Sequence, residues 1–300
     1  MNDIYSYAND LYPLVTKRFN SEYANYVETM KSLITIENTD RVDVREEGTG
    51  GFGEIPDYDG SSVPELAAKR GFVAIYTPKE KLAKATVSYK KAKIDMSGEA
   101  AKTGTRLAAS IGMTRLMDFY RLFANGFNPA YVGGDGKALF AADHPMSSDA
   151  QNTQTFNNLG TSVFSVAAIT IAQAAARRFL TVDGFPFLCK YDVVLVSPEL
   201  EAKAREFFGK EAKLLPQSQE NGANPVGDTK YFVIDGFTAK QWAVGDQRLI
   251  KEYMKMVQIT APRVDMSKAA SNPYFTEYFV YSDYVLGFSE WRQIYGFNPA

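Results

Sequence analysis

One cluster of residues in this sequence could support hydrolysis, and it surrounds the single histidine, His144. Asp143 precedes it directly and Ser147 and Ser148 follow closely, so a base and a nucleophile are near each other along the chain. A catalytic triad is defined by its geometry in space, however, and adjacent side chains rarely point at each other. A single histidine also excludes a metal site built from several histidines. We therefore predict that His144 is a hydrogen-bonded loop residue and that the chain has no catalytic or metal-binding residues.

Cys189 is the only cysteine, so no disulfide can form within the chain, which fits a reducing cytoplasm. It lies beside Leu188, just before a predicted strand. A free cysteine in such a position is usually a small buried apolar residue. Pairs of carboxylates are uninformative, because 35 acidic residues make chance pairs certain. We predict no nucleophilic role for this cysteine.

A glycine-rich string, GTGGFG at residues 48–53, matches the pattern of a dinucleotide-binding loop. Such a loop should follow a strand and open a helix, but the next residues, EIPDYDG, cannot open a helix. A kinase-type glycine loop would need a lysine on the following strand, where the sequence has VAIY at residues 73–76. We therefore predict no cofactor.

The composition is that of a folded protein without a strong charge. Hydrophobic residues make up 45% and charged residues 23% of the 300 residues, a length typical of about two domains. The formal net charge of -2 lacks the basic excess of a nucleic-acid-binding protein. No signal peptide and no membrane-spanning run is recognisable, so synthesis in the cytosol and no membrane partner are expected. The 18 tyrosines fit either a tyrosine-rich core or surfaces buried against a partner.

A long β-hairpin that projects from the body of the protein is predicted in the first third of the chain. Residues 46–64 are rich in Gly, Pro and Asp, which favours turns and exposed loop. Stretches rich in β-forming residues follow at 71–76 and 85–89. A lone hairpin is only marginally stable in water, so a long one implies a partner surface.

Opposite charges divide this region. Residues 37–59 hold eight acidic and two basic residues, for a charge of -6, and residues 69–93 hold eight basic and one acidic residue, for a charge of +7. One explanation is a solvated hairpin with weak ion pairs between its strands. The other is a pair of complementary patches that meet between subunits. The candidates for contacts between subunits are Glu46, Glu47, Glu54, Asp57, Asp59, Lys69, Arg70, Lys79, Lys81 and Lys84.

A long helix is predicted over residues 97–125, with Leu107, Ile111 and Phe119 on one face. Arg115 and Asp118 interrupt this face. A helix of this length would span about 40 Å and could serve as a spine. The other predicted elements are a helical first 35 residues, helices over 165–180 and 199–208, strands over 191–196 and 230–235, and a β-rich segment over 274–288.

The order of these elements resembles that of the major capsid proteins of tailed bacteriophages, which have the Hong Kong 97-type fold. Three phrases carry the resemblance: GDGKALFAADHP (134–145), YDVVLVSP (191–198) and VLGFSEWRQIYGF (285–297). The first is similar to a loop after the spine helix, the second to the entry of the axial domain, and the third to the closing strands of the peripheral domain. The Mu-like major head subunits look most similar.

The resemblance implies an α+β fold in four parts. They are an N-terminal arm (1–45), an extended β-hairpin loop (46–95), a peripheral domain with the spine helix (96–165 and 260–300), and an inserted axial α/β domain (166–259). It also implies a structural role, in which the chain forms the icosahedral shell of a virion after assembly in the host cytoplasm.

The partners that the resemblance implies are many copies of the chain itself, arranged as pentamers and hexamers. A scaffolding protein, a portal and decoration proteins are further expected partners, and packaged DNA is contacted only non-specifically. Two alternatives remain at this point. One is an encapsulin-like bacterial compartment shell, which has the same fold, and the other is a soluble α/β enzyme of unknown reaction.

Overall fold

The computed structural model describes residues 3–48, 51–58, 60, 63–88, 98–149, 152–208, 226, 228–267 and 274–300. The chain forms two compact units, each assembled from segments that are distant in sequence. The first unit comprises Met1–Val44, Tyr76–Phe119 and Lys255–Leu286, and the second comprises Arg45–Ile75, Tyr120–Met254 and Gly287–Ala300. Among the residues described, no helix is both long enough and apolar enough to cross a bilayer.

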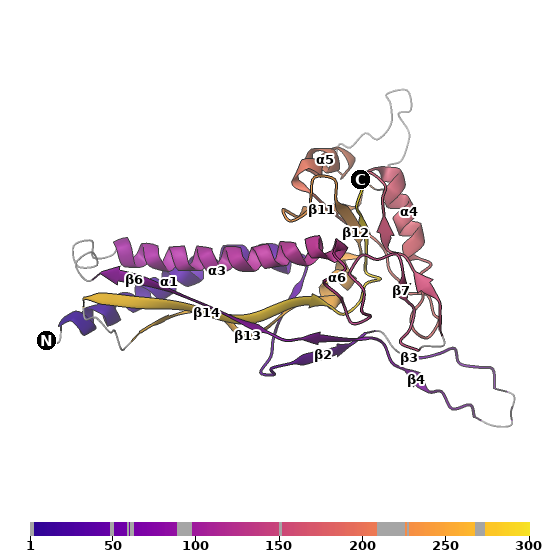
Figure 1. The fold of residues 1–300 in the computed structure, drawn as a ribbon, viewed down its shortest axis with the longest axis horizontal. Coiled ribbons are helices and arrows are strands. Elements are labelled where there is room, and N and C mark those ends of the chain that lie inside the picture. Colours follow the sequence, from indigo (N-terminus) through magenta and orange to yellow (C-terminus); the bar gives the residue numbers. More distant parts are fainter. Residues whose placement is uncertain are drawn as a thin grey trace. The chain divides into compact units, whose positions relative to one another are not determined.

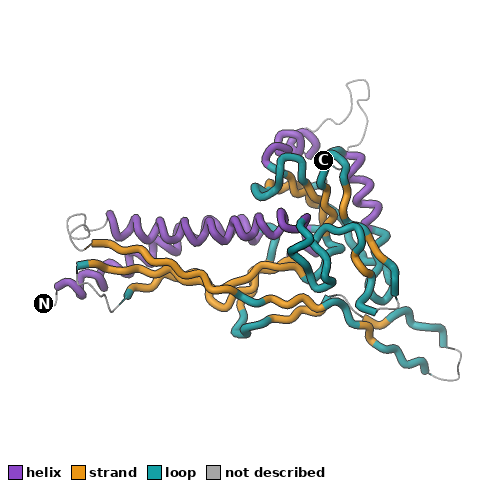
Figure 2. The backbone as a smooth tube through the Cα atoms, in the orientation of Figure 1, coloured by secondary structure: helices purple, strands orange, loops and turns teal. Residues whose placement is uncertain are grey.

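The first unit packs two long helices on one face of a four-stranded sheet (Figure 1). The strand order is β1-β13-β14-β6, with β1 parallel to β13 and β14 antiparallel to β6. Figure 2 shows the long strands running beside the long helix of this unit. The elements are α1 (Asp3–Lys31), β1 (Thr35–Asn38), β6 (Lys79–Ser88), α3 (Gly98–Ala124), β13 (Met254–Met266) and β14 (Phe275–Phe288).

Helix α3 confirms the helix predicted over residues 97–125. Its apolar face, including Leu107 and Ile111, packs with Val15 and Phe19 of α1 in the core of the unit. Two glycines allow α1 to approach closely. A Cβ at Gly104 would lie 2.6 Å from the Val15 carbonyl oxygen, and one at Gly112 would lie 2.5 Å from the Tyr26 ring. Both contacts are too short for any larger residue, so the close pairing of the helices depends on these two positions.

The second unit contains a five-stranded sheet with the order β11-β10-β12-β15-β9. Trp242 of β12 and Phe297 of β15 stack with ring centroids 3.9 Å apart at the centre of its core. Its strands are β9 (Leu159–Gly160), β10 (Val193–Val196), β11 (Lys230–Val233), β12 (Trp242–Gly245) and β15 (Ile294–Phe297), and a separate pair is formed by β7 (His144–Pro145) and β8 (Thr155–Phe156). Its helices are α4 (Val166–Ala176), α5 (Glu201–Phe208), α6 (Gln247–Tyr253) and the short 3-10 helices η1 (Asn125–Phe127) and η2 (Pro198–Leu200).

Local sequence signals explain where these helices begin. The Ser165 hydroxyl accepts a hydrogen bond from the Ala168 amide and caps α4. The Asp246 carboxylate accepts bonds from two amides in the first turn of α6. Pro198 lies at the first position of η2, where a missing amide proton has no cost. The predicted helices and strands of this region are therefore confirmed, with small differences at their ends.

A hairpin leaves the body of the second unit between residues 45 and 75 (Figure 1). It consists of β2 (Val44–Glu47) beside β5 (Val73–Tyr76) and, further out, β3 (Gly51–Phe52) beside β4 (Ala68–Lys69). The strands converge at Gly48 and Gly71, where a Cβ on Gly71 would lie 2.5 Å from the Gly48 carbonyl oxygen. The Gly48 amide donates to the Phe72 carbonyl at 2.7 Å. The hairpin therefore has a narrow base that only glycine permits.

The projecting hairpin is shorter than the sequence predicted. The strand predicted over residues 85–89 does not return along the hairpin, because it belongs to β6 and pairs with β14 over ten positions. Ala85 and Val87 of β6 pack into the core of the first unit, and this burial favours the sheet over an exposed ribbon. The return strand is formed by β4 and β5 instead.

The strands of the C-terminal segment, in which the sequence resembles the closing strands of a peripheral domain, belong to two different sheets. β14 runs without a break from Phe275 to Phe288, and all but its last two residues belong to the first unit. β15 instead pairs with β12 in the sheet of the second unit, with Phe297 opposite Trp242. The burial of Phe297 against that indole explains the change of sheet.

Candidate functional site

The cluster around His144 does not form a hydrolytic site. Its ring is fully buried, whereas the neighbouring Asp143 is exposed and forms an ion pair with Lys137. The hydrogen bond from Lys137 lowers the pKa of the Asp143 carboxyl. Ser147 instead accepts a hydrogen bond from the Asp149 amide. Across the described ranges, no three His, Cys, Asp or Glu side chains are grouped closely enough to hold a metal ion.

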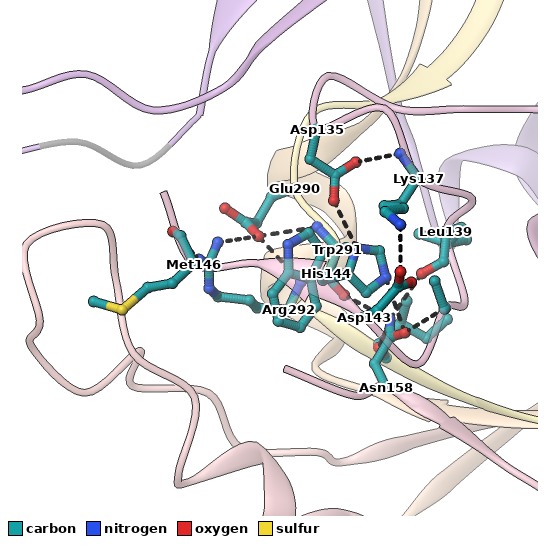
Figure 3. A network of polar contacts seen from close by, with 12 residues as sticks. Asp135, Lys137, Leu139, Asp143, His144, Met146, Asn158, Glu290, Trp291 and Arg292 are labelled. Atoms are coloured by element: carbon teal, nitrogen blue, oxygen red, sulfur yellow. Dashed lines mark hydrogen bonds and ion pairs between the residues drawn. The ribbon is translucent and has the colours of Figure 1, made fainter. Parts of the chain in front are cut away.

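His144 is held by residues that are distant in sequence (Figure 3). Its Nδ1 lies 2.6 Å from Asp135 Oδ2, and its Nε2 lies 3.1 Å from Asn158 Oδ1. The ring stacks on Trp291, with centroids 4.2 Å apart and planes at 9°. The prediction that the histidine is hydrogen-bonded is confirmed, but His144 lies in the short strand β7 and not in a loop. The sequence did not reveal Asp135 as its partner, because nine residues separate the two.

Next to this ring lies a second buried ion pair, between Glu290 and Arg292, with Oε1 2.7 Å from Nη1. The Arg292 guanidinium also donates to the carbonyls of Leu180 and Met146, at 2.8 and 3.0 Å. These contacts tie three segments of the second unit together. All of these side chains are buried, so their role is in the structure of the unit and they offer no reactive surface.

Cys189 is buried, and its thiol donates to the Ala176 carbonyl at 3.3 Å. Burial, with a smaller contribution from the Asp246 carboxylate, raises the pKa of this thiol to about 12. The thiolate that attacks thiol reagents is therefore scarce at neutral pH.

We expect native protein to react with a disulfide reagent such as dithionitrobenzoate only as fast as the second unit opens. Protein unfolded in urea should release one equivalent of the reporter at once, because Cys189 is the only thiol. Stopped-flow absorbance measures both rates. Immediate reaction of the native protein would contradict the buried position of the thiol.

The most exposed apolar residues of the second unit include four on the hairpin. Phe52, Ile55, Tyr58 and Val63 have between 59% and 85% of their surface exposed. Three of them recur at every third position, among exposed acidic residues. A two-stranded ribbon has no second layer that could cover such side chains. We call these four exposed apolar residues (Phe52, Ile55, Tyr58 and Val63) the hairpin patch, and their exposure fits side chains that are covered by a partner.

The predicted contact residues are divided between the two units. Glu46 and Glu47 lie on β2, Lys69 lies on β4, and Glu54, Asp57 and Arg70 lie on the hairpin outside its strands. Asp59 lies outside the described residues. Lys79, Lys81 and Lys84 lie on β6 in the first unit.

Two of the predicted basic contacts already have acidic partners within the chain. Lys81 pairs with Asp118 and Lys84 with Glu277, both at 3.1 Å. The charges on the hairpin itself, at Glu54, Asp57 and Arg70, are exposed. Sequence reasoning emphasised these charges and missed the hairpin patch, although apolar residues at every third position of a Gly- and Pro-rich segment were a visible signal.

Comparison with known proteins defines the class of fold. No protein-family model and no curated protein matches the sequence. The capsid of the native GTA particle matches 91% of this chain over 90% of its own, with 11% identity and a TM-score of 0.57. The capsid of the cyanophage P-SCSP1u matches 90% of this chain over 87% of its own, with 9% identity and a TM-score of 0.57. A virus-like particle from Pyrococcus furiosus matches 95% of this chain over 97% of its own, with 9% identity and a TM-score of 0.50.

These likenesses confirm the predicted α+β fold of the Hong Kong 97 type. The chain therefore has the fold of a shell-forming capsid subunit. Since the similarity extends over about nine tenths of this chain and of the capsid chains, both compact units take part in it.

Proposed function

We propose that this chain is the major capsid protein of a tailed bacteriophage and that copies of it assemble into the icosahedral shell around packaged DNA. The observation that carries the proposal is the capsid fold, shared over nearly the whole length of the chain. The protein is a structural component of the virion, assembled in the host cytoplasm, and not an enzyme.

The hairpin patch is the contact that this function needs. In a closed shell each subunit uses one surface to bind a different surface of its neighbour, so contacts repeat around pentamers and hexamers. Covering Phe52, Ile55 and Tyr58 removes apolar area from water at every such contact. The exposed charges of Glu54 and Asp57 then select the register of the contact.

In this proposal the chain has the four parts implied by the resemblance, namely the arm, the extended loop, the peripheral domain and the axial domain, with the extended loop formed by the hairpin between residues 45 and 75. Further partners are a scaffolding protein, a portal and decoration proteins. DNA is contacted only non-specifically, in line with the net charge of -2.

The second candidate is an encapsulin-like compartment shell that holds cargo enzymes. The likeness to a virus-like particle from Pyrococcus furiosus keeps this candidate in second place, because it extends over 95% of this chain but has a TM-score of 0.50, against 0.57 for the GTA and cyanophage capsids. The contents of the particles distinguish the two, since a phage shell packages DNA and a compartment co-purifies with cargo protein. A soluble α/β enzyme, the third candidate, predicts a small oligomer and no shell.

Light scattering and negative-stain electron microscopy of the purified full chain test the proposal. We expect closed particles of about 2 MDa or more, because the smallest icosahedral shell needs about 60 copies of a 33.3-kDa chain. A monomer or small oligomer at every concentration, both in the expression lysate and after purification, would argue against a shell protein.

A further inference from the structure

The amide of Asn158 has only one possible orientation. Its Oδ1 accepts the Ala141 amide proton at 2.9 Å. Its Nδ2 faces the carbonyl oxygens of Leu139, at 2.7 Å, and of Ile294, at 3.1 Å. If the amide were turned by 180°, its oxygen would face carbonyl oxygens and its NH₂ would face an N–H group. The backbone around it therefore fixes the oxygen on the side of His144.

This orientation determines what the imidazole must do. Oδ1 of Asn158 can only accept, so His144 Nε2, 3.1 Å away, must carry a proton and donate it. Nδ1 lies 2.6 Å from the Asp135 carboxylate, a distance that also requires a proton between the two atoms. Both ring nitrogens therefore have a proton beside them, whether the proton near Asp135 is covalently bound to Nδ1 of His144 or to the Asp135 carboxylate.

The surroundings favour a proton at this position. The Trp291 ring lies flat against the imidazole, and an aromatic face attracts a cation. The other charges nearby are already paired, Glu290 with Arg292 and Asp143 with Lys137. Asp135 and His144 are both almost fully buried, so without the shared proton an uncompensated carboxylate would remain in the interior.

We propose that His144 and Asp135 hold a shared proton in the folded protein, and that this proton helps Asn158 to tie its part of the second unit to the C-terminal segment. A neutral imidazole carries one proton, and the Asp135 carboxylate, 2.6 Å away, holds that proton on Nδ1. The Nε2 lone pair then faces Oδ1 of Asn158, and two acceptors oppose each other at 3.1 Å in a buried site. Asn158 is the residue that bonds both Leu139 and Ile294, so its link between the two segments weakens. The second unit thus contains a proton-dependent latch, independent of whether the chain forms shells.

The direction of the pH dependence follows from the proton count. An exposed histidine in the unfolded chain loses its proton above about pH 6.5. The folded state then binds one proton more than the unfolded state, so stability falls as the pH rises. For one extra proton, the ratio of folded to unfolded protein should fall about tenfold per pH unit wherever the folded state holds that proton and the unfolded state does not.

Nitrogen-15 NMR of the full chain, labelled at histidine, tests this directly because the chain has one histidine. Magic-angle spinning allows the measurement on assembled material. At about pH 7.5, roughly one unit above the titration of an exposed histidine, we expect both ring nitrogens to show the shifts of protonated sites. One protonated and one bare nitrogen would overturn the proposal, and this result needs no variant to fold.

Two matched variants test the source of the effect. Asp135→Asn removes the buried carboxylate and should convert the imidazole to its neutral form at the same pH, with loss of the pH slope of stability. Asp143→Asn makes the same change at the exposed carboxylate next to His144, and should leave both the spectrum and the slope unchanged. If Asp143→Asn and not Asp135→Asn alters the proton count, the pairing proposed here is wrong.

Discussion

Replacing residues 49–70 by a single Asn is expected to leave a folded protein that no longer forms shells. The excision is possible because Gly48 and Gly71 are in contact at the base of the hairpin and the Gly48 amide already bonds the Phe72 carbonyl. An Asn followed by Gly71 would then supply a two-residue turn of the type that hairpins favour. The removed segment contains the whole hairpin patch, so the contact proposed to join neighbours is lost.

Circular dichroism and electron microscopy check the two halves of this prediction. The helical signal should be unchanged, because α1 and most of α3 lie in the other unit, whereas particles should be absent. Particles of normal size from the excised chain would show that the hairpin is not needed for assembly.

A point substitution makes the same test at finer scale. Ile55→Ser should reduce particle yield, because it removes an apolar side chain that is 80% exposed on the hairpin. Leu188→Ser is the matched control, since Leu188 is 87% exposed on a different loop of the second unit. Equal losses from both substitutions would point to general solubility effects and not to the hairpin patch.

Arg115→Ala is expected to destabilise the first unit strongly, with a loss of about 2–5 kcal/mol. The side chain is fully buried, and its guanidinium donates to Gln258 Oε1 at 2.6 Å and to Ser282 Oγ at 3.2 Å. Its centre lies 4.6 Å from the Tyr284 ring, which remains neutral because burial and a hydrogen bond to Asp118 raise the pKa of its phenol. Alanine would leave a cavity and remove the partner of two buried polar groups.

Two further variants separate charge from packing. Arg115→Met should cost much less, because it keeps most of the volume, and Gln258 and Ser282 retain other hydrogen bonds, to Asn38 and to the Thr260 carbonyl. Arg106→Ala removes an exposed arginine from the same helix and should change stability by less than about 0.5 kcal/mol. A loss from Arg115→Ala as small as that of Arg106→Ala would show that the buried guanidinium is not needed for the fold.

Urea unfolding measures these effects, with each Arg variant made in the chain that lacks residues 49–70 so that assembly does not interfere. Far-UV circular dichroism follows α1 and α3, the two longest helices described. Tryptophan fluorescence follows only the second unit, since Trp242 and Trp291 both lie there. The Arg115 variants should therefore shift the circular dichroism transition more than the fluorescence transition.

Several features could be predicted from the sequence alone because they depend on neighbouring residues. The apolar spacing of Leu107, Ile111 and Phe119 predicted α3 almost to its ends. Ser165 and Pro198 marked the starts of helices, since capping involves amides within one turn. The scarcity of catalytic side chains was also visible, because one histidine and one cysteine are a matter of composition.

Other features were decided only by the tertiary structure. The strand at residues 85–89 could have paired within a hairpin, but the burial of Val87 in the first unit favours pairing with β14, almost 200 residues later. β15 pairs with β12, where Phe297 meets Trp242. His144 binds Asp135 and not the adjacent Asp143, and Arg115, which interrupts an apolar face, is buried against Tyr284. The physical reason is common to all four, because a strand partner, an ion pair or a buried charge is selected by groups that the fold brings together from distant parts of the chain.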